Sequence, residues 1–282
     1  MMQLLRKAFH FLIFSSIYVS VCSVLITFQT NQLFTLQYNS YQYLLFVFFS
    51  TICSYNFHWY LTREAAAENR RISWTQQHRH LHILLFLAGA AGAAWYFFYF
   101  SEHWVWLAGA ALLTFLYSAP KLSYQPFIFL RRIAIGKTIY LAFVWMYTTT
   151  FIPFLLSEQP LEPRSILFCV NRFFFLYAIC IVFDYRDRVH DKKQGIKSMI
   201  TYFSEQGIDA LFYLSITLFT VGTGALYLYH FPAYILFSQL LPAAMLVWLY
   251  PVAKKNFSDY IYYFALDGLI MLSPLIQLIY YF

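Results

Sequence analysis

The stretch from residue 210 to residue 253 decides the fold class. It reads ALFYLSITLFTVGTGALYLYHFPAYILFSQLLPAAMLVWLYPVA and contains no Asp, Glu, Lys or Arg. Residues 8–62 form a second stretch without any of these four residue types. One membrane-spanning helix needs about 20 apolar residues, so each stretch has room for two spans and the turn between them. The sequence therefore predicts an all-α, polytopic membrane protein.

The composition of the whole chain excludes a soluble protein. Of its 282 residues, 61% are hydrophobic and only 11% are charged, and the mean hydropathy is +0.57. A soluble domain has about 25% charged residues, which this chain cannot supply for a water-exposed surface. No repeat and no low-complexity linker divides the sequence, so we expect residues 1–282 to form a single membrane domain.

Hydropathy and turn residues together predict nine spans. The sixth is the least regular, because it carries Arg172 in its middle. The predicted spans lie near residues 8–28, 38–60, 81–100, 102–119, 133–156, 164–185, 205–229, 232–250 and 259–282.

The basic residues outside these spans indicate the orientation. Alternate loops carry nearly all of them, whereas the other set of loops carries only Arg164. The positive-inside rule then places the N-terminus and the basic loops in the cytoplasm, and Phe282 outside. We expect an integral protein of a bacterial inner membrane. The net charge of +7 reflects this topology, so no nucleic-acid partner is expected.

Three acidic residues follow the sixth predicted span at helical spacing. Asp184, Asp187 and Asp191 stand at i, i+3 and i+7, which places them along one face of a helix that continues past the membrane. Magnesium typically takes one or two protein carboxylates and completes its shell with water and phosphate oxygens. The row therefore favours a metal-bridged diphosphate. The alternative is a solvated helix end whose acids pair with neighbouring basic residues.

Two loops predicted at the same membrane face carry lysines after turn residues. Residues 117–121 read YSAPK and end in Lys121, and residues 195–198 read GIKS and contain Lys197. A lysine fixed by a turn is suited to a phosphate contact.

Together these motifs resemble the UbiA superfamily of intramembrane prenyltransferases, over most of the chain. Members have nine helices around a central cavity, acid-rich motifs after the second and sixth helices, and a Tyr-Ser-x-Pro-Pro-like loop with basic residues after the fourth. The second acidic motif is matched by Asp184, Asp187 and Asp191 with the tail at residues 195–198. The loop is matched at residues 117–121, with Arg131 and Arg132 beyond.

The first acidic motif departs from the family pattern. The usual Asn-Asp-x-x-Asp-x-x-x-Asp is replaced by NFHWYLTRE at residues 56–64, which keeps Asn56 and an acid at Glu64. Because residues 56, 60, 64 and 68 lie four apart, Asn56, Glu64 and Glu68 form one stripe on an extended helix and could help to bind one metal. Alternatively, the two glutamates only balance nearby arginines. We expect His58 to be a partly buried side chain with a local partner.

The resemblance implies a Mg²⁺-dependent prenyltransferase that moves an isoprenoid chain from a polyprenyl diphosphate to a lipophilic or aromatic acceptor. It leaves two alternatives: a noncatalytic lipid-binding protein of the same fold, and a small transporter. Donor length, acceptor and oligomeric state are not indicated. The implied site has catalytic roles for Asn56, Glu64, Asp184, Asp187 and Asp191, metal binding by Glu64, Glu68, Asp184, Asp187 and Asp191, and diphosphate binding by Lys121, Arg131, Arg132 and Lys197.

Two further ionisable residues lie inside predicted spans. Arg172 is in the sixth and Asp267 in the ninth. Burial of a charge in the membrane is costly, so we expect each to face the bundle interior or to have a partner.

Overall fold

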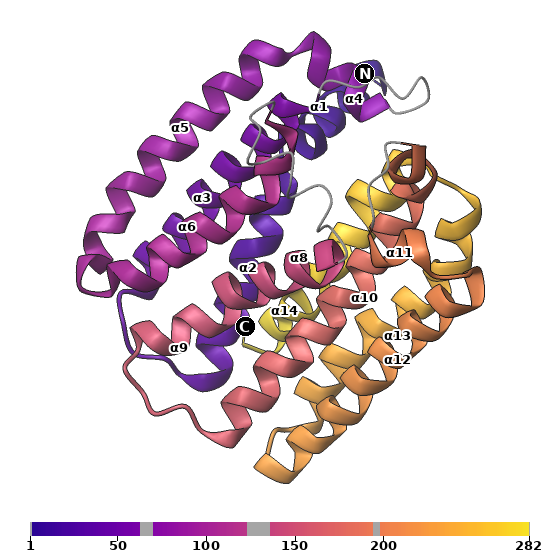
Figure 1. Ribbon diagram of the computed structural model, residues 1–282. Helices are drawn as coiled ribbons and strands as arrows, with labels where there is room; N and C mark the ends of the chain where they lie inside the picture. Colours follow the sequence, from indigo (N-terminus) through magenta and orange to yellow (C-terminus); the bar gives the residue numbers. More distant parts are fainter. Residues whose placement is uncertain (1, 63–69, 123–135, 194–197, 282) are drawn as a thin grey trace.

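The computed structural model describes residues 2–62, 70–122, 136–193 and 198–281, and every regular element among them is a helix (Figure 1). The α-helices are α1 Met2–Phe14, α2 Ile17–Phe34, α3 Ser40–Leu61, α4 Arg70–Gln77, α5 Arg79–Phe97, α6 Trp104–Ser118, α8 Lys137–Met146, α9 Ile152–Leu156, α10 Pro163–Lys193, α11 Met199–Tyr202, α12 Glu205–Ala225, α13 Ala233–Lys255 and α14 Asp267–Tyr281. Short 3-10 or π-helical segments are η1 Phe98–His103, η2 Ala119–Lys121, η4 Tyr147–Phe151, η5 Leu226–Tyr229 and η6 Ile261–Leu266.

Seven segments of the described chain are long and apolar enough to cross a membrane. One of them, Arg79–Lys121, has 43 residues, about twice what a bilayer of about 30 Å requires. It bends at Phe100, whose φ of −126° and ψ of 27° are not helical, so α5 and α6 are two crossings. The uncharged helix α3 is too rich in polar side chains to be counted by hydropathy. When α5 and α6 are counted separately and α3 is added, the seven segments become nine, and these correspond to the nine predicted spans.

The first span begins later than predicted. Helix α1 ends at Phe14, and Ser16 adopts the left-handed conformation with φ 69°, so the apolar crossing is α2 at Ile17–Phe34 rather than residues 8–28. A serine is an unusual residue for positive φ. The break is held by two donors from other helices. Asn56 Nδ2 donates to the carbonyl of Ser15 at 3.1 Å, and Arg71 Nη2 donates to Ser16 Oγ at 3.3 Å.

The helices close into a ring. Going round it, α2 contacts α3, α3 contacts α6, α6 contacts α8, α8 contacts α10, α10 contacts α13, α13 contacts α14, and α14 returns to α2. Helix α5 packs against α3 on the outside, and α12 packs against α10 and α13 (Figure 1). A pocket of about 520 Å³ lies between α8, η4 and α10, and because its lining includes exposed apolar side chains such as Ile166 and Val170, it faces outward.

A glycine sets the close approach of α5 to α3. A Cβ atom added at Gly89 would lie 2.6 Å from the backbone nitrogen of Cys53, which is much closer than a carbon can approach. Small residues at such crossings let membrane helices pack backbone to backbone. The separation of α3 and α5 therefore depends on the missing side chain at residue 89.

We predict that Gly89→Ala destabilises the protein by about 1–3 kcal/mol, because the added methyl group meets backbone atoms that cannot rotate away. The measurement is thermal unfolding in detergent, followed by circular dichroism. Gly224→Ala is the matched control, since a Cβ atom there meets nothing within 4 Å. An equal loss of stability in both variants would contradict this account of Gly89.

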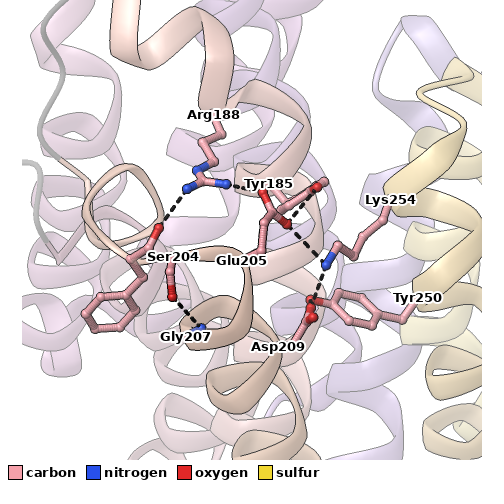
Figure 2. Close-up of polar contacts among 9 residues, drawn as sticks. Tyr185, Arg188, Ser204, Glu205, Gly207, Asp209, Tyr250 and Lys254 are labelled. Carbon is pink, nitrogen blue, oxygen red and sulfur yellow. Dashed lines mark hydrogen bonds and ion pairs between the residues drawn. The ribbon is translucent and has the colours of Figure 1, made fainter.

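Ion pairs join the ends of α10, α12 and α13 (Figure 2). Lys254 Nζ lies 2.6 Å from Asp209 Oδ1 and 3.3 Å from Glu205 Oε2. Glu205 also accepts hydrogen bonds from Tyr185 and from Arg188 of α10. Because these partners come from three helices, the network fixes the end of α10, on which the acidic motif stands.

We predict that Lys254→Met lowers the free energy of unfolding by about 1 kcal/mol, and that the loss shrinks in high salt, because partly exposed ion pairs are weak and screened. Thermal unfolding at low and high ionic strength measures it. Lys255→Met is the control, because Lys255 is an exposed neighbour on the same turn. A loss that does not change with salt would show that packing of the lysine stem, rather than charge, holds these helices.

Candidate active site

The candidate site lies at the motif end of the bundle, which we define as the end where α3 and α6 finish and α8 begins, at Leu61, Ser118 and Lys137. Helix α10 runs on to Lys193 beyond its apolar segment, as the spacing of the acids predicted. Several of the predicted site residues lie outside the described residues: Glu64, Glu68, Arg131, Arg132 and Lys197.

Two acids of α10 share one lysine from α8. Lys137 Nζ lies 3.5 Å from Asp184 Oδ1 and 3.6 Å from Asp191 Oδ2. Residues seven apart are nearly two full turns apart, so both carboxylates point to the same side. Thr138, next to Lys137, donates a hydrogen bond of 2.5 Å to Asp184 Oδ2. The start of α8 thus covers the acidic face of α10.

The third acid has different surroundings. Asp187 is partly exposed, and its Oδ1 accepts a hydrogen bond of 3.1 Å from Nε of Arg186. Asp191 is buried, and burial raises the pKa of its carboxyl, while the nearby Lys137 ammonium acts in the opposite direction. Asp191 Oδ2 has no hydrogen-bond partner. The acidic row therefore holds two buried carboxylates and one that is partly exposed.

These carboxylates suit a magnesium ion that is also held by substrate. Among the described residues, no group of three or more His, Cys, Asp or Glu side chains could hold a metal ion by itself. Asp184 and Asp191 nevertheless place two carboxylates around a single ammonium, and one of their oxygens is buried without a hydrogen-bond donor. Magnesium needs only one or two protein carboxylates when phosphate oxygens complete its shell. The donor set fits that mode of binding.

A web of cations and aromatic rings lies beside the acids. Arg186 Nη2 donates to Tyr263 Oη at 2.6 Å, and the Arg186 guanidinium lies 3.9 Å from Asp259. The guanidinium carbon of Arg71 lies 4.1 Å from the ring centre of Trp59 and 4.2 Å from that of Tyr263. The main-chain N–H of Arg71 donates to Asp259 Oδ2 at 3.0 Å. Helix α4 thus places a buried cation between α3 and η6.

Asn56 makes hydrogen bonds to protein groups with both ends of its amide. Its Nδ2 donates to the carbonyls of Ser15 and Ile52, at 3.1 and 2.8 Å. Its Oδ1 lies 2.7 Å from His82 Nδ1, and an amide oxygen can only accept, so Nδ1 carries the proton. Asn56 and His82 are both fully buried. In this arrangement Asn56 joins α3 to the α1–α2 break and to α5.

His58 contacts three residues of the YSAPK loop. Tyr117 stacks on its ring at 5.3 Å between centres, Ser118 Oγ lies 3.1 Å from Nδ1, and Lys121 Nζ lies 2.7 Å from Nε2. Lys121 also donates to Thr62 Oγ1 at 2.5 Å. The predicted phosphate-binding lysine is therefore held by His58 of α3 and by Thr62, next to the positions where the usual first motif carries acids.

The two intramembrane ionisable residues both lie in the bundle interior. Arg172 is buried, and its Nη2 donates to Gln29 Oε1 at 2.7 Å. Asp267 is buried at the start of α14, within electrostatic range of Arg71 and Arg186. Arg172 thus has the partner that the sequence analysis expected, and Asp267 lies below the motif end.

Sequence reasoning missed several residues of this site. Lys137 lies within the predicted span 133–156, so it is not among the loop residues that the sequence analysis considers, and Arg71 enters that analysis only as one of the basic loop residues. His58 was expected to have only a local partner, whereas it contacts Lys121, 63 positions away. A lysine at the start of a span opposite an acidic motif is a signal that could have found Lys137. Nothing in the sequence singles out Arg71 among four arginines in one loop.

Two solved structures share this fold. An apo structure of a UbiA homologue from Aeropyrum pernix K1 matches with a TM-score of 0.55 and 14% sequence identity, over 94% of each chain. A structure described as digeranylgeranylglyceryl phosphate synthase matches with a TM-score of 0.53 and 12% identity, over 97% of this chain and 96% of its own. The search of curated proteins found no match.

The sequence itself settles the family. The sequence model of the UbiA prenyltransferase family matches residues 69–262, which is more than half of the chain and includes the acidic row of α10, the YSAPK loop and Arg71. The ring of spans and the placing of these motifs at one end agree with that match. The protein is an integral membrane protein that belongs to the UbiA prenyltransferase family.

Proposed function

We propose that the protein is a magnesium-dependent prenyltransferase, which transfers an isoprenoid chain from a polyprenyl diphosphate to a lipophilic or aromatic acceptor. One observation carries the proposal. At a single end of the ring, the paired carboxylates Asp184 and Asp191 lie in one electrostatic neighbourhood with the cations Lys121, Lys137 and Arg71. A metal-bound diphosphate needs both kinds of group, carboxylates for the metal and cations for the phosphate oxygens.

The acidic row would hold the magnesium ion. Asp184 and Asp191 are the residues proposed to bind it, with Asp187 at the exposed edge of the same row. Bound Mg²⁺ neutralises charge on the diphosphate and so makes it a better leaving group. Glu64 and Glu68, which the sequence analysis assigned to a metal, keep that role as a proposal.

The cations would stabilise the leaving group. When the bond between C1 of the isoprenoid and the diphosphate oxygen breaks, its electron pair stays on the diphosphate, and the added charge is met by Lys121, Lys137 and Arg71. We keep Arg131, Arg132 and Lys197 as proposed further contacts. The acceptor then forms a bond to C1 and loses a proton.

Aromatic rings would protect the allylic cation. The rings of Trp59 and Tyr263 already make cation–π contacts with the guanidinium of Arg71. Deeper in the ring, Trp145 Nε1 donates to Tyr55 Oη at 3.2 Å, which presents a second aromatic pair from α8 and α3. Each such face stabilises a nearby cation by about 0.5–2 kcal/mol. The surrounding apolar spans keep out water, which would otherwise trap the cation as an alcohol.

A noncatalytic lipid-binding role is the second candidate, and Asn56 favours it. The amide of this residue is engaged by Ser15, Ile52 and His82, and aromatic residues stand at positions 57 and 60, where the family carries acids. These features suit a first motif that has a structural role.

The orientation with the motif end in the cytoplasm is also a proposal, and it is based on the basic loops.

The purified protein in detergent with Mg²⁺ is expected to release diphosphate from farnesyl or geranylgeranyl diphosphate. The acceptors are a panel of phenols, long-chain alcohols and a glyceryl phosphate lipid, the last chosen after the second structural neighbour. Radiolabelled product and released diphosphate are both measured. Folded protein that binds these donors but never cleaves them would contradict catalysis and support the lipid-binding role.

Asp191→Asn is expected to lower turnover by at least about 100-fold, which corresponds to about 2.7 kcal/mol, because the amide keeps the shape of the carboxylate and removes the charge that a metal requires. Glu102→Gln is the matched control, since this acid is exposed in η1, between α5 and α6. A full rate for Asp191→Asn at limiting Mg²⁺ would remove Asp191 from the proposed metal site.

A further inference from the structure

We propose that His58 is a positioning residue that fixes the ammonium of Lys121 for direct, metal-independent contact with the donor's diphosphate. This inference rests on the proposed function and deepens it. It assigns a role to a side chain that lies between positions 57 and 60, the two positions at which the first motif has lost its acids. The contact with phosphate on the α3 side is then made by a lysine.

The two partners of His58 favour one tautomer of its ring. When Lys121 carries its proton, its ammonium can only donate, so Nζ donates to Nε2 of His58, which is then unprotonated. The proton of the neutral imidazole is then on Nδ1, where it donates to Ser118 Oγ. His58 therefore has one defined tautomer, oriented at both nitrogens by residues of the same loop. The stacked ring of Tyr117 fixes the plane of the imidazole.

Lys121 is hydrogen-bonded to neutral acceptors, which do not compensate its positive charge. The described residues provide two acceptors for its three N–H groups, His58 Nε2 and Thr62 Oγ1, and neither carries a negative charge. Lys137 differs, since it lies within 4 Å of Asp184 and Asp191. Within the part of the chain that the structure describes, Lys121 has no carboxylate at ion-pair distance, so its positive charge is not neutralised by direct contact.

The position of Lys121 faces the proposed metal site. Its ammonium lies in the electrostatic range of Asp187 and Asp191 on α10 and of Lys137 on α8. A diphosphate held at the acidic row would therefore lie in the electrostatic range of the Lys121 ammonium, which His58 of α3 and Thr62 hold in place. Free rotation about the side-chain bonds of Lys121 would weaken this contact. The hydrogen bonds of Lys121 with His58 and Thr62, which we call the clamp, restrict that rotation before the ligand binds.

Binding of inorganic pyrophosphate in excess EDTA tests the clamp without turnover. Titration calorimetry on the full-length protein in detergent is expected to show binding by the wild type. His58→Phe, which keeps a ring but removes both nitrogens, and Lys121→Met should each weaken binding at least about tenfold. His58→Gln should stay within about threefold of the wild type, because its carbonyl oxygen can accept from Lys121. His103→Gln, in η1 between α5 and α6, is the control.

The outcomes separate the inference from the proposed function. Wild-type binding in EDTA that depends on His58 supports the clamp even if no donor is ever cleaved. Absence of binding in EDTA, or equal binding by the wild type and His58→Phe, overturns the clamp even if prenyl transfer occurs. If His58→Phe fails to fold, Ser118→Ala replaces it. That change removes the hydroxyl partner of His58 Nδ1, so the ring is no longer held in one tautomer. It is expected to weaken pyrophosphate binding without changing the unfolding temperature. Unchanged binding overturns the inference.

Discussion

The ammonium of Lys137 between Asp184 and Asp191 is the interaction on which the motif end depends. An unpaired charge at the edge of the membrane is costly, and removal of one partner from a buried ion pair leaves the other uncompensated. Because the lysine begins α8 and the acids end α10, the pair fixes how these helices meet. Asp184 and Asp191 are thereby kept buried under the start of α8.

The described residues on the α3 side of the same end carry positive charge. The family's first motif would place carboxylates there, whereas the described residues of this chain place Lys121 and Arg71, held by His58, Thr62 and the ring of Trp59. An anionic ligand between α3 and α10 would then have the proposed metal site on one side and fixed cations on the other. The aromatic residues at positions 57 and 60, which stand in place of acids, contribute to this asymmetry.

The spans and the clustering of motifs could be predicted from sequence, because absence of charge and loop basicity are properties of short segments. The spacing of three aspartates indicates a helix that continues past the sixth span, and α10 does continue beyond its apolar segment to Lys193. The break at Ser15 and Ser16 could not be predicted, since no glycine or proline marks it and its donors come from α3 and α4. The roles of His58 and Lys137 depend on contacts between distant helices, which periodicity does not encode.

The α1–α2 break gives Asn56 a structural role that needs no metal. When a helix is interrupted inside the bundle, a carbonyl loses its partner in the helix and needs another donor, or it costs about 1–3 kcal/mol. Asn56 supplies that donor to Ser15, while His82 fixes the amide from the other side. The asparagine of the first motif therefore has a structural role that does not depend on a metal. Asp184 and Asp191 share a single lysine, so their two negative charges are incompletely compensated, and the proposed magnesium ion would supply the missing positive charge.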